Sequence, residues 1–208
     1  MSAFFTFEGI EGAGKSTHAA RLAEALRLES SDVLLTREPG GTELGRALRG
    51  LLLHEETPPP LPETELLLYL ADRAEHVRRI IQPALARGTI VIADRFSAST
   101  LAYQGYGRGL PLEEIAGLDA FARGGLEPTL TFLLDLPVEI GLRRAIGSGP
   151  GDRIEREALS FHERVRAGFH ALAAARPDRL VLIDAERDVE HVFRDVAELA
   201  RSALGGRL

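Results

Sequence analysis

The chain alternates between short apolar runs and longer segments whose apolar residues recur at helical spacing. The apolar runs occupy residues 3–7, 33–35, 90–93, 130–134 and 180–183. Apolar runs of this length, broken here only by Thr6 and Thr131, are typical of strands buried on both faces, as in a parallel sheet. The pattern therefore predicts a parallel sheet of about five strands.

Amphipathic helices are predicted in the segments between these runs. They cover Lys15–Leu28 and residues 63–86, 161–175 and 189–204, and Pro83 is expected to bend or end the second helix. Strands that alternate with helices imply a parallel sheet with helices on both faces, so the expected fold class is a three-layer α/β/α fold. The length suits a single domain over residues 1–208.

The charge balance limits the partners of the chain. Its net charge is −6, so no global field gathers nucleic acid or anionic lipid, and a site for a polyanion must be built locally. The lack of cysteine excludes disulfides and cysteine nucleophiles. No apolar run approaches the ~18–20 residues that span a bilayer, and residues 1–5 lack the basic start of a signal peptide. We therefore expect a cytoplasmic protein that binds neither a nucleic-acid polymer nor a membrane.

A glycine-rich motif stands between the first predicted strand and the first predicted helix. Gly9-Ile10-Glu11-Gly12-Ala13-Gly14-Lys15-Ser16 matches the pattern G-x-x-x-x-G-K-[ST] and is followed by Thr17. Its glycines let backbone N–H groups converge on phosphate oxygens, and the helix adds its positive N-terminal end. Lys15, the single lysine among 25 basic residues, supplies a charge to the outer phosphates. The motif predicts a P-loop NTPase-type site for ATP, formed by residues 9–17.

Two oxygen ligands are expected for the Mg²⁺ that accompanies ATP. The Ser16 hydroxyl of the P-loop is one of them. The apolar run at residues 90–93 ends on Asp94, whose carboxylate would reach Mg²⁺ directly or through water. The six histidines, His162 and His170 among them, show no metal-ligand spacing, so solvated or capping roles are expected for them.

Three classes of P-loop protein are considered: a kinase for a small acceptor, a GTPase switch, and an ATPase that drives a partner. GTPase switches read guanine through an Asn-Lys-x-Asp motif, which the position of the single lysine excludes. An ATPase that acts on nucleic acid would carry a basic face or a further domain, and neither is evident.

Arginines near the strand ends favour the kinase. Arg37 follows the second apolar run, Arg95 follows the third, and Arg73 stands one helical turn past Tyr69. Guanidinium groups suit phosphates and base edges, and a tyrosine ring can stack on a base. Surface ion pairing is the usual fate of any one arginine, but their recurrence around a P-loop indicates a second small anion as the acceptor.

Five segments carry a resemblance to a known family. They are residues 7–15, Thr36-Arg37-Glu38-Pro39-Gly40-Gly41-Thr42, Asp94-Arg95-Phe96, Ala102-Tyr103-Gln104-Gly105 and Asp152-Arg153-Ile154-Glu155. From residue 4 to about residue 184 the chain closely resembles the bacterial type of thymidylate kinase (dTMP kinase). The resemblance implies a homodimeric enzyme that transfers the γ-phosphate of Mg·ATP to dTMP, giving dTDP for dTTP synthesis.

The resemblance also implies roles in the acceptor pocket. Glu11 would hold the region of the sugar 3′-hydroxyl, and Tyr69 would stack on thymine. Arg73 would contact the thymine edge, whereas Arg95 would bind the acceptor phosphate with Arg37 beside it.

Three further positions match residues that face base and sugar in the family, and they are Thr100, Tyr103 and Gln104. Tyr103 would crowd a 2′-hydroxyl and so favour deoxyribose.

A lid is implied at about residues 142–155. In this lid Arg143 and Arg144 would cover ATP, and Arg153 is the best match for the catalytic arginine. The chain departs from close relatives at Ile146 and Ser148, where arginines are expected, and this puts more weight on Arg153.

The acceptor of such a reaction is itself a phosphate, and this decides what the site must do. Its second pKa is near 6, so at pH 7 an ionised oxygen can attack without a general base. The residues expected to be catalytic are then Lys15, Arg95 and Arg153, which would neutralise the charge that spreads over the transferred group.

Two alternatives stay open at this point. A deoxynucleoside kinase phosphorylates a sugar hydroxyl and needs a carboxylate base, for which Glu38 is a candidate. We prefer a structural role for Glu38, in which it pairs with Arg37 or with the Gly40-Gly41 amides. A non-catalytic nucleotide-binding regulator would bind ATP without turnover.

Overall fold

The computed structural model describes residues 2–29, 31–53, 58–147 and 151–205. Its sheet has five parallel strands in the order β2-β3-β1-β4-β5. The strands are β1 (Phe4–Glu8), β2 (Val33–Arg37), β3 (Ile90–Asp94), β4 (Leu130–Asp135) and β5 (Leu180–Asp184). The parallel sheet of about five strands, predicted from the apolar runs, is confirmed.

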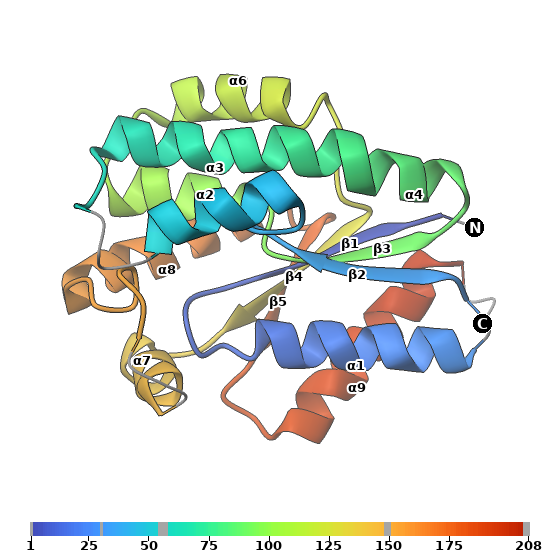
Figure 1. Ribbon diagram of the computed structural model, residues 1–208. Helices are drawn as coiled ribbons and strands as arrows, with labels where there is room; N and C mark the ends of the chain where they lie inside the picture. The colour runs from blue at the N-terminus through green and yellow to red at the C-terminus, as the bar shows by residue number, and fades with distance from the viewer. Residues whose placement is uncertain (1, 30, 54–57, 148–150, 206–208) are drawn as a thin grey trace.

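Helices cover both faces of this sheet (Figure 1). One face carries α1 (Lys15–Leu28) and α9 (Val189–Ala203), and the opposite side holds α3 (Pro62–His76), α4 (Gln82–Ala86) and α6 (Leu112–Ala122). The other helical elements are α2 (Glu43–Leu53), η1 (Val77–Ile81), α5 (Ser97–Thr100), η2 (Leu101–Gly107), α7 (Val138–Ile146) and α8 (Leu159–Ala175). The three-layer α/β/α prediction is therefore confirmed as well.

The central strand β1 shows why a run of consecutive apolar residues forms this sheet. All five of its residues are buried. Successive side chains point to opposite faces of a strand. Phe5 and Phe7 join the large core that includes α1, whereas Phe4 packs with Val77 and Ile81 of η1 on the other side. Helices on both sides thus bury every position of β1, and its one polar residue before the charged end, Thr6, is hydrogen-bonded to the Thr131 hydroxyl at 2.8 Å.

Each of the five strands ends in a charged residue. The terminal residues are Glu8, Arg37, Asp94, Asp135 and Asp184. Every strand therefore extends one or two residues past its predicted apolar run, because backbone pairing continues where the apolar pattern stops. Since all strands are parallel, these charged residues meet at one edge of the sheet, where open α/β sheets bind ligands.

The long helix predicted for residues 63–86 is one rod with a local change of pitch. It runs through α3, the π-helical turn η1 and α4. Pro83 lies in the first turn of α4, and the helix continues past it to Ala86, so of the two predicted effects, a bend or an end, the end is not observed at Pro83. In the wider π-helical turn before Pro83, Gln82 donates its N–H to the Val77 carbonyl. Pro83 has no N–H that would need an acceptor in this turn, so the helix can continue past it. Among the described helices, none has the length and apolar character needed to cross a bilayer.

Candidate active site

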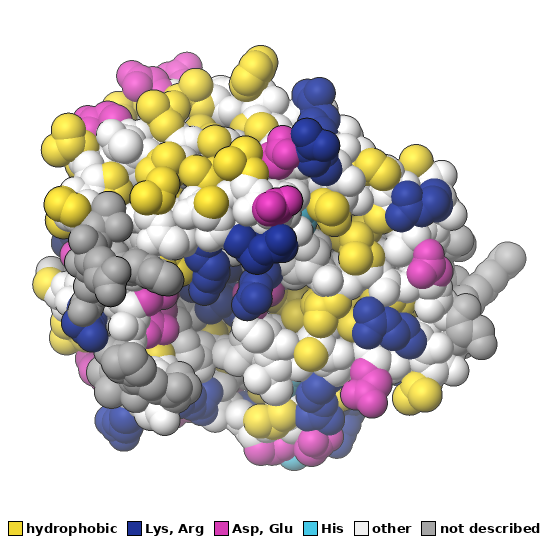
Figure 2. All heavy atoms as spheres, in the orientation of Figure 1, with side chains coloured by type: hydrophobic (Ala, Val, Ile, Leu, Met, Phe, Trp, Pro, Cys, Tyr) yellow, Lys and Arg dark blue, Asp and Glu magenta, His cyan; other side chains and the backbone are white. Residues whose placement is uncertain are grey.

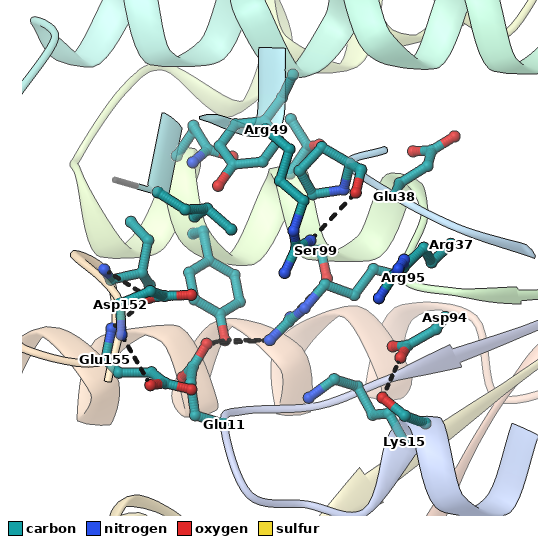
Figure 3. Close-up of a pocket in the computed structure, with 18 of the residues that line it drawn as sticks. Glu11, Lys15, Arg37, Glu38, Arg49, Asp94, Arg95, Ser99, Asp152 and Glu155 are labelled. Carbon is teal, nitrogen blue, oxygen red and sulfur yellow. Dashed lines mark hydrogen bonds and ion pairs between the residues drawn. The ribbon is translucent and has the colours of Figure 1, made fainter. Parts of the chain in front are cut away.

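A pocket opens at the carboxyl edge of the sheet, and most of the predicted site residues line it. It lies between the P-loop, the ends of β2 and β3, α3, η2 and the turn at residues 152–155 (Figure 3). The predicted residues in its lining are Glu11, Gly12, Lys15, Ser16, Arg37, Tyr69, Arg73, Asp94, Arg95, Thr100, Tyr103 and Gln104. The structure therefore brings the ATP motif and the expected acceptor residues into one cavity.

The backbone of the P-loop adopts conformations that favour glycine. Gly9, Gly12 and Gly14 have φ values of 138°, 68° and 86°. A Cβ on Gly12 would lie 2.0 Å from the carbonyl oxygen of Gly141 in α7, and a Cβ on Gly141 would lie 2.5 Å from that of Glu11. The loop and α7 thus pack backbone against backbone, and the loop follows a path that side chains would obstruct.

The first turn of α1 is built to face an anion. In the described structure no side chain caps its N-terminus, and its first turn holds no acidic residue. The free N–H groups and the helix dipole therefore favour phosphate there. The pocket lining does not include Gly9, Ile10, Ala13, Gly14 or Thr17, which lie in the loop or in the first turn of α1, and their contact with ATP stays a prediction.

Lys15 is held with its ammonium group inside the loop. Its Nζ donates a hydrogen bond to the Ile10 carbonyl oxygen at 2.6 Å. Burial and the charge of Arg95 lower its pKa from 10.5 to about 8, although Asp94, Glu11 and Glu8 oppose the shift. A bound phosphate would add negative charge beside this ammonium and favour its protonated form.

The two residues predicted to bind Mg²⁺ lie in contact. The Ser16 hydroxyl donates to Oδ2 of Asp94, the last residue of β3. A hydroxyl and a carboxylate are the hard oxygen ligands that Mg²⁺ prefers. Within the described ranges no group of three or more His, Cys, Asp or Glu side chains forms a metal cage. The donor set therefore fits an ion that also takes ligands from phosphates and water.

Arg95 occupies a strained position at the end of β3. Its φ is 75°, a conformation that costs energy for a residue with a long side chain. Two backbone contacts hold it, because Arg95 N–H donates to the Phe7 carbonyl at 3.0 Å and the next N–H, of Phe96, donates to Glu8 Oε1 at 2.9 Å. This conformation turns the Arg95 guanidinium back toward the P-loop, where it donates to the Gly9 carbonyl at 3.1 Å.

Glu11 is an ionised carboxylate beside this guanidinium, and the two side chains point toward one another in Figure 3. Its Oε1 accepts from Arg95 Nη2 at 3.0 Å and from the Tyr103 hydroxyl, while Oε2 lies 3.2 Å from Nδ1 of His162. Burial opposes ionisation, but His162 and the charges of Arg95 and Lys15 outweigh it and lower the pKa of Glu11 from 4.5 to about 2. Glu11 therefore accepts hydrogen bonds and carries no proton to donate.

Arg73 forms part of a buried ionic cluster behind the pocket. Its guanidinium contacts Glu38 at 2.8 Å, Asp119 at 2.7 Å and the Thr100 hydroxyl at 2.8 Å, and its side chain is only 2% exposed. Burial opposes its charge, but the two carboxylates outweigh that effect and raise the pKa of Arg73. The contact with the thymine edge that the resemblance implies would have to be made with donors that already have partners.

Glu38 has a structural role, as expected, but its partners differ from those expected. Its two oxygens pair with Arg73 and with Nδ1 of His76, at 2.9 Å. The Gly40 N–H instead donates to Asp72 Oδ1 at 3.1 Å, and Arg37 lies exposed at the end of β2. With both oxygens engaged, Glu38 is not placed to serve as the general base of a deoxynucleoside kinase.

The rest of the expected acceptor wall comes from α3 and η2. Tyr69 is half-buried in the lining, and burial raises the pKa of its hydroxyl. Gln104 donates to Glu65 Oε1 at 2.9 Å, and the Tyr103 ring packs against Phe161 and Phe169 of α8. Buried contacts thus hold Tyr103 and Gln104 in this wall.

Arg153 lies outside the lining. Its Nη2 donates to Glu65 Oε2 at 2.5 Å and its Nε to the Leu52 carbonyl at 2.8 Å. A role on the transferred phosphate would require Arg153 to leave both partners.

The two other arginines assigned to the lid, Arg143 and Arg144, also lie outside the pocket lining. Arg143 and Arg144 are exposed on α7, where Arg144 donates to the Ala185 carbonyl at 3.1 Å. Ser148 lies outside the described residues, as does the side chain of Ile146. Covering of ATP by Arg143 and Arg144 stays a prediction.

Sequence reasoning missed several residues of the site. Ser99, Asp152 and Glu155 line the pocket, and Glu8 supports the turn at Arg95 without reaching the lining. His162 was expected to be solvated or to cap a helix, but it is fully buried against Glu11. Its place beside the apolar stripe of α8 was the one signal that could have suggested burial.

Comparison with known proteins gives the chain a family. The thymidylate kinase family model matches residues 7–196. The thymidylate kinase of Synechococcus sp. (strain JA-2-3B'a(2-13)) is 59% identical over 183 residues, which are 88% of this chain and 86% of that protein. That of Desulfovibrio desulfuricans is 52% identical over 97% of this chain and 94% of its own.

A solved structure agrees with the sequence comparisons. The crystal structure of thymidylate kinase from Ehrlichia chaffeensis matches with a TM-score of 0.79 and 36% identity, covering 96% of this chain and 98% of that one. The prediction of a nucleotide-binding kinase is confirmed. On sequence and on structure, the chain belongs to the thymidylate kinase family.

Proposed function

We propose that the pocket at the carboxyl edge of the sheet is where this family member transfers the γ-phosphate of ATP to dTMP, giving ADP and dTDP. One observation carries the proposal: the P-loop and the Arg95–Glu11–Tyr103 cluster face the same cavity. The P-loop provides for the phosphates of ATP, and the Arg95 side of the cavity provides for the phosphate and sugar of the acceptor. Two anions can then meet in line between Lys15 and Arg95.

The chemistry needs charge neutralisation more than proton transfer. The acceptor phosphate carries an ionised oxygen at pH 7, so it attacks without a base. Lys15 would bind the outer phosphates of ATP, and Arg95 would bind the acceptor phosphate. Ser16 and Asp94 would hold Mg²⁺, which would neutralise part of the negative charge on the phosphates of ATP.

The acceptor base is assigned to the wall that α3 and η2 build. Tyr69 would stack on thymine, and Thr100 and Gln104 would line its edge. We infer that Arg73 shapes this wall from behind through Thr100, because its strongest contacts are carboxylates. Tyr103, held by Glu11, would leave no room for a 2′-hydroxyl.

We also propose a homodimer, with one domain over residues 1–208 and a lid at about residues 142–155. Apolar side chains gather over α2, α3 and α6 in Figure 2. Phe121 is 83% exposed, Leu67 57% and Leu118 43%. An exposed apolar patch of this kind favours association with a second copy. Analytical ultracentrifugation of wild type and of Phe121→Glu tests it, since the variant is expected to sediment as a monomer.

An acceptor screen tests the reaction. A coupled ADP-release assay with Mg·ATP compares dTMP with thymidine, and we expect turnover with dTMP alone. Turnover with thymidine but not with dTMP would favour a deoxynucleoside kinase. ATP binding without turnover on any acceptor would favour a regulator. A cytoplasmic location remains a prediction, which cell fractionation tests.

A further inference from the structure

Glu65 is a buried carboxylate directly behind the acceptor wall. It lies in the first turn of α3, its side chain is 1% exposed, and it is not part of the pocket lining. Arg108 contacts both of its oxygens, each at 3.1 Å, and Arg153 contacts Oε2 at 2.5 Å. Gln104, which does line the pocket, donates to Oε1 from its amide nitrogen Nε2 at 2.9 Å. One carboxylate thus joins two arginines to an amide of the pocket wall.

This carboxylate is ionised. Burial opposes its charge, but hydrogen bonds from Arg108 and Gln104 and the charge of Arg108 outweigh burial and lower the pKa of Glu65. An ionised carboxylate accepts hydrogen bonds and donates none. The amide atom of Gln104 that faces Glu65 is therefore the nitrogen, because an amide oxygen there would meet a second acceptor at hydrogen-bond distance. Glu65 thus decides which way round the Gln104 amide sits.

The oxygen of the Gln104 amide is left for a ligand. Among the described residues, none donates a hydrogen bond to its Oε1. This oxygen does not belong to the fully enclosed polar atoms that lack a partner, so it is accessible from the cavity. An amide oxygen only accepts, so the edge of a ligand that meets it must carry a donor. At this point the wall presents an acceptor.

Pyrimidine bases differ in the group that they offer to such an acceptor. Thymine and uracil carry an N–H at ring position 3, between two carbonyl groups. Cytosine carries a bare nitrogen at position 3 and an amino group in place of the 4-carbonyl. A fixed amide oxygen therefore suits the N3–H of thymine or uracil and meets a lone pair on cytosine. An amide that is free to turn over would also offer its NH2 group, which suits cytosine.

We propose that Glu65 is a positioning residue that determines base specificity: it holds the Gln104 amide with its oxygen toward the pocket, so that the site takes pyrimidine monophosphates with an N3–H and rejects those of cytosine. This inference rests on the proposed function, because it takes a pyrimidine nucleotide as the acceptor. Glu65 acts from outside the pocket and touches no substrate. Arg108 and Arg153 keep it charged, and its charge keeps the amide from turning over.

The test compares the binding of dTMP with that of 5-methyl-2′-deoxycytidine 5′-monophosphate, which differs from dTMP only at positions 3 and 4 of the base. Glu65→Gln replaces the carboxylate with an amide of the same size, which can donate or accept, so the Gln104 amide can adopt both orientations. A third nucleotide, dUMP, keeps the N3–H and lacks only the methyl group, so it reports on the shape of the wall. Arg108→Met is the matched control, because it removes a partner of Glu65 and leaves the contact with Gln104 in place.

Titration calorimetry of the full-length protein gives a Kd for each nucleotide. We expect Glu65→Gln to reduce the ratio of the Kd of the cytosine nucleotide to that of dTMP by about tenfold or more. The ratio for dUMP and dTMP should stay within about twofold of wild type, because both bases carry the N3–H. Arg108→Met should lower the Tm and leave both ratios within about twofold. In a Gln104→Ala background, Glu65→Gln should cause no further loss of preference.

An unchanged preference for dTMP over the cytosine nucleotide in Glu65→Gln would overturn the proposal and leave Glu65 a structural ion-pair partner. A wild-type protein that binds these two nucleotides equally would overturn it too. If Glu65→Gln fails to fold, as judged by its Tm, the double variant Glu65→Gln/Arg108→Met, which removes a cation together with the carboxylate, must show the same fall in preference. A wild-type enzyme that binds dTMP without phosphorylating it would instead contradict the proposed function, whereas binding alone decides the role of Glu65.

Discussion

Arg95 and Arg73 stand at the same edge of the sheet, yet their surroundings are opposite. The Arg95 guanidinium contacts one carboxylate, Glu11, and otherwise carbonyl and hydroxyl oxygens, and its side chain is 22% exposed. The Arg73 guanidinium contacts two carboxylates and is almost fully enclosed. Lys15 and Arg37 add positive charge on the Arg95 side of the pocket.

This comparison teaches how to separate a ligand-binding arginine from a scaffolding one. An arginine whose charge is fully balanced by carboxylates has little attraction left for an anion. An arginine with one carboxylate and several neutral acceptors keeps a net field toward the pocket. By this criterion we expect Arg95 to act on the acceptor phosphate and Arg73 to stabilise the wall behind it.

Removal of Arg95 is expected to give the largest effect. Arg95→Met takes away the cation that meets the acceptor phosphate, so kcat/KM for dTMP should fall about 10³-fold or more, while the Tm changes little. Steady-state kinetics and a thermal melt measure both quantities. A loss below tenfold would break the comparison, because Arg95 would then be no more a ligand-binding residue than Arg73.

Removal of Arg73 should show the reverse pattern. Arg73→Met leaves Glu38 and Asp119 buried without their cation, so the free energy of unfolding should drop by about 3–5 kcal/mol. Urea denaturation measures the drop, and the folded fraction should keep kcat within about tenfold. Arg79→Met, at an arginine 71% exposed in a helix-surface pair, is the matched control and should change stability by less than about 0.5 kcal/mol.

The carboxylate that supports the Arg95 turn predicts a pH effect on stability. Burial raises the pKa of Glu8 from 4.5 to about 7, against the opposing hydrogen bond from Ser99 and the charge of Arg95. Between these values the unfolded chain is ionised at this residue while the folded protein holds the proton. The free energy of unfolding therefore falls as pH rises through this window, by about 3 kcal/mol in total.

Glu8→Gln removes this titration and keeps an acceptor for the Phe96 N–H. Denaturation of variant and wild type at pH 4 and pH 8 should show a fall about 3 kcal/mol smaller in the variant. Glu24→Gln, which removes an exposed carboxylate of α1, serves as the control. Identical pH profiles for wild type and Glu8→Gln would contradict the prediction.

The smallest effect is expected at Arg153. Its guanidinium is engaged by Glu65 and the Leu52 carbonyl, so Arg153→Ala should lower kcat by about tenfold or less. An arginine that acts on the transferred phosphate would cost about 10³–10⁵. A loss of that size at unchanged Tm would show that Arg153 leaves Glu65 during turnover and acts as the sequence resemblance implies.

The parts of the molecule that were predictable from sequence are those that local pattern controls. The strands followed from consecutive apolar residues, and the P-loop from the glycine spacing at residues 9–16. Helix α1 was predicted at its observed bounds, since its amphipathic spacing starts at the motif itself. The helices α2, α6 and α7 were missed, although α2 and α7 are clearly amphipathic; each is only two or three turns long, so the pattern repeats too few times to stand out.

The parts that were not predictable depend on contacts between distant segments. The pairing of Arg73 with Glu38 and Asp119 joins residues 35 and 46 positions apart, and no local pattern specifies it. The same holds for His162, whose partner Glu11 lies near the other end of the chain. Sequence therefore identified which residue types belong to the site, and the fold decided which of them face the pocket.

The backbone contact between the P-loop and α7 constrains how this sequence can evolve. A side chain on Gly12 would run into the Gly141 carbonyl, and a side chain on Gly141 would run into the Glu11 carbonyl. Glycine inside a helix costs about 1 kcal/mol relative to alanine, so drift toward alanine at Gly141 would strengthen α7 alone and push it off the loop. Neither glycine can therefore be replaced unless the P-loop and α7 move apart.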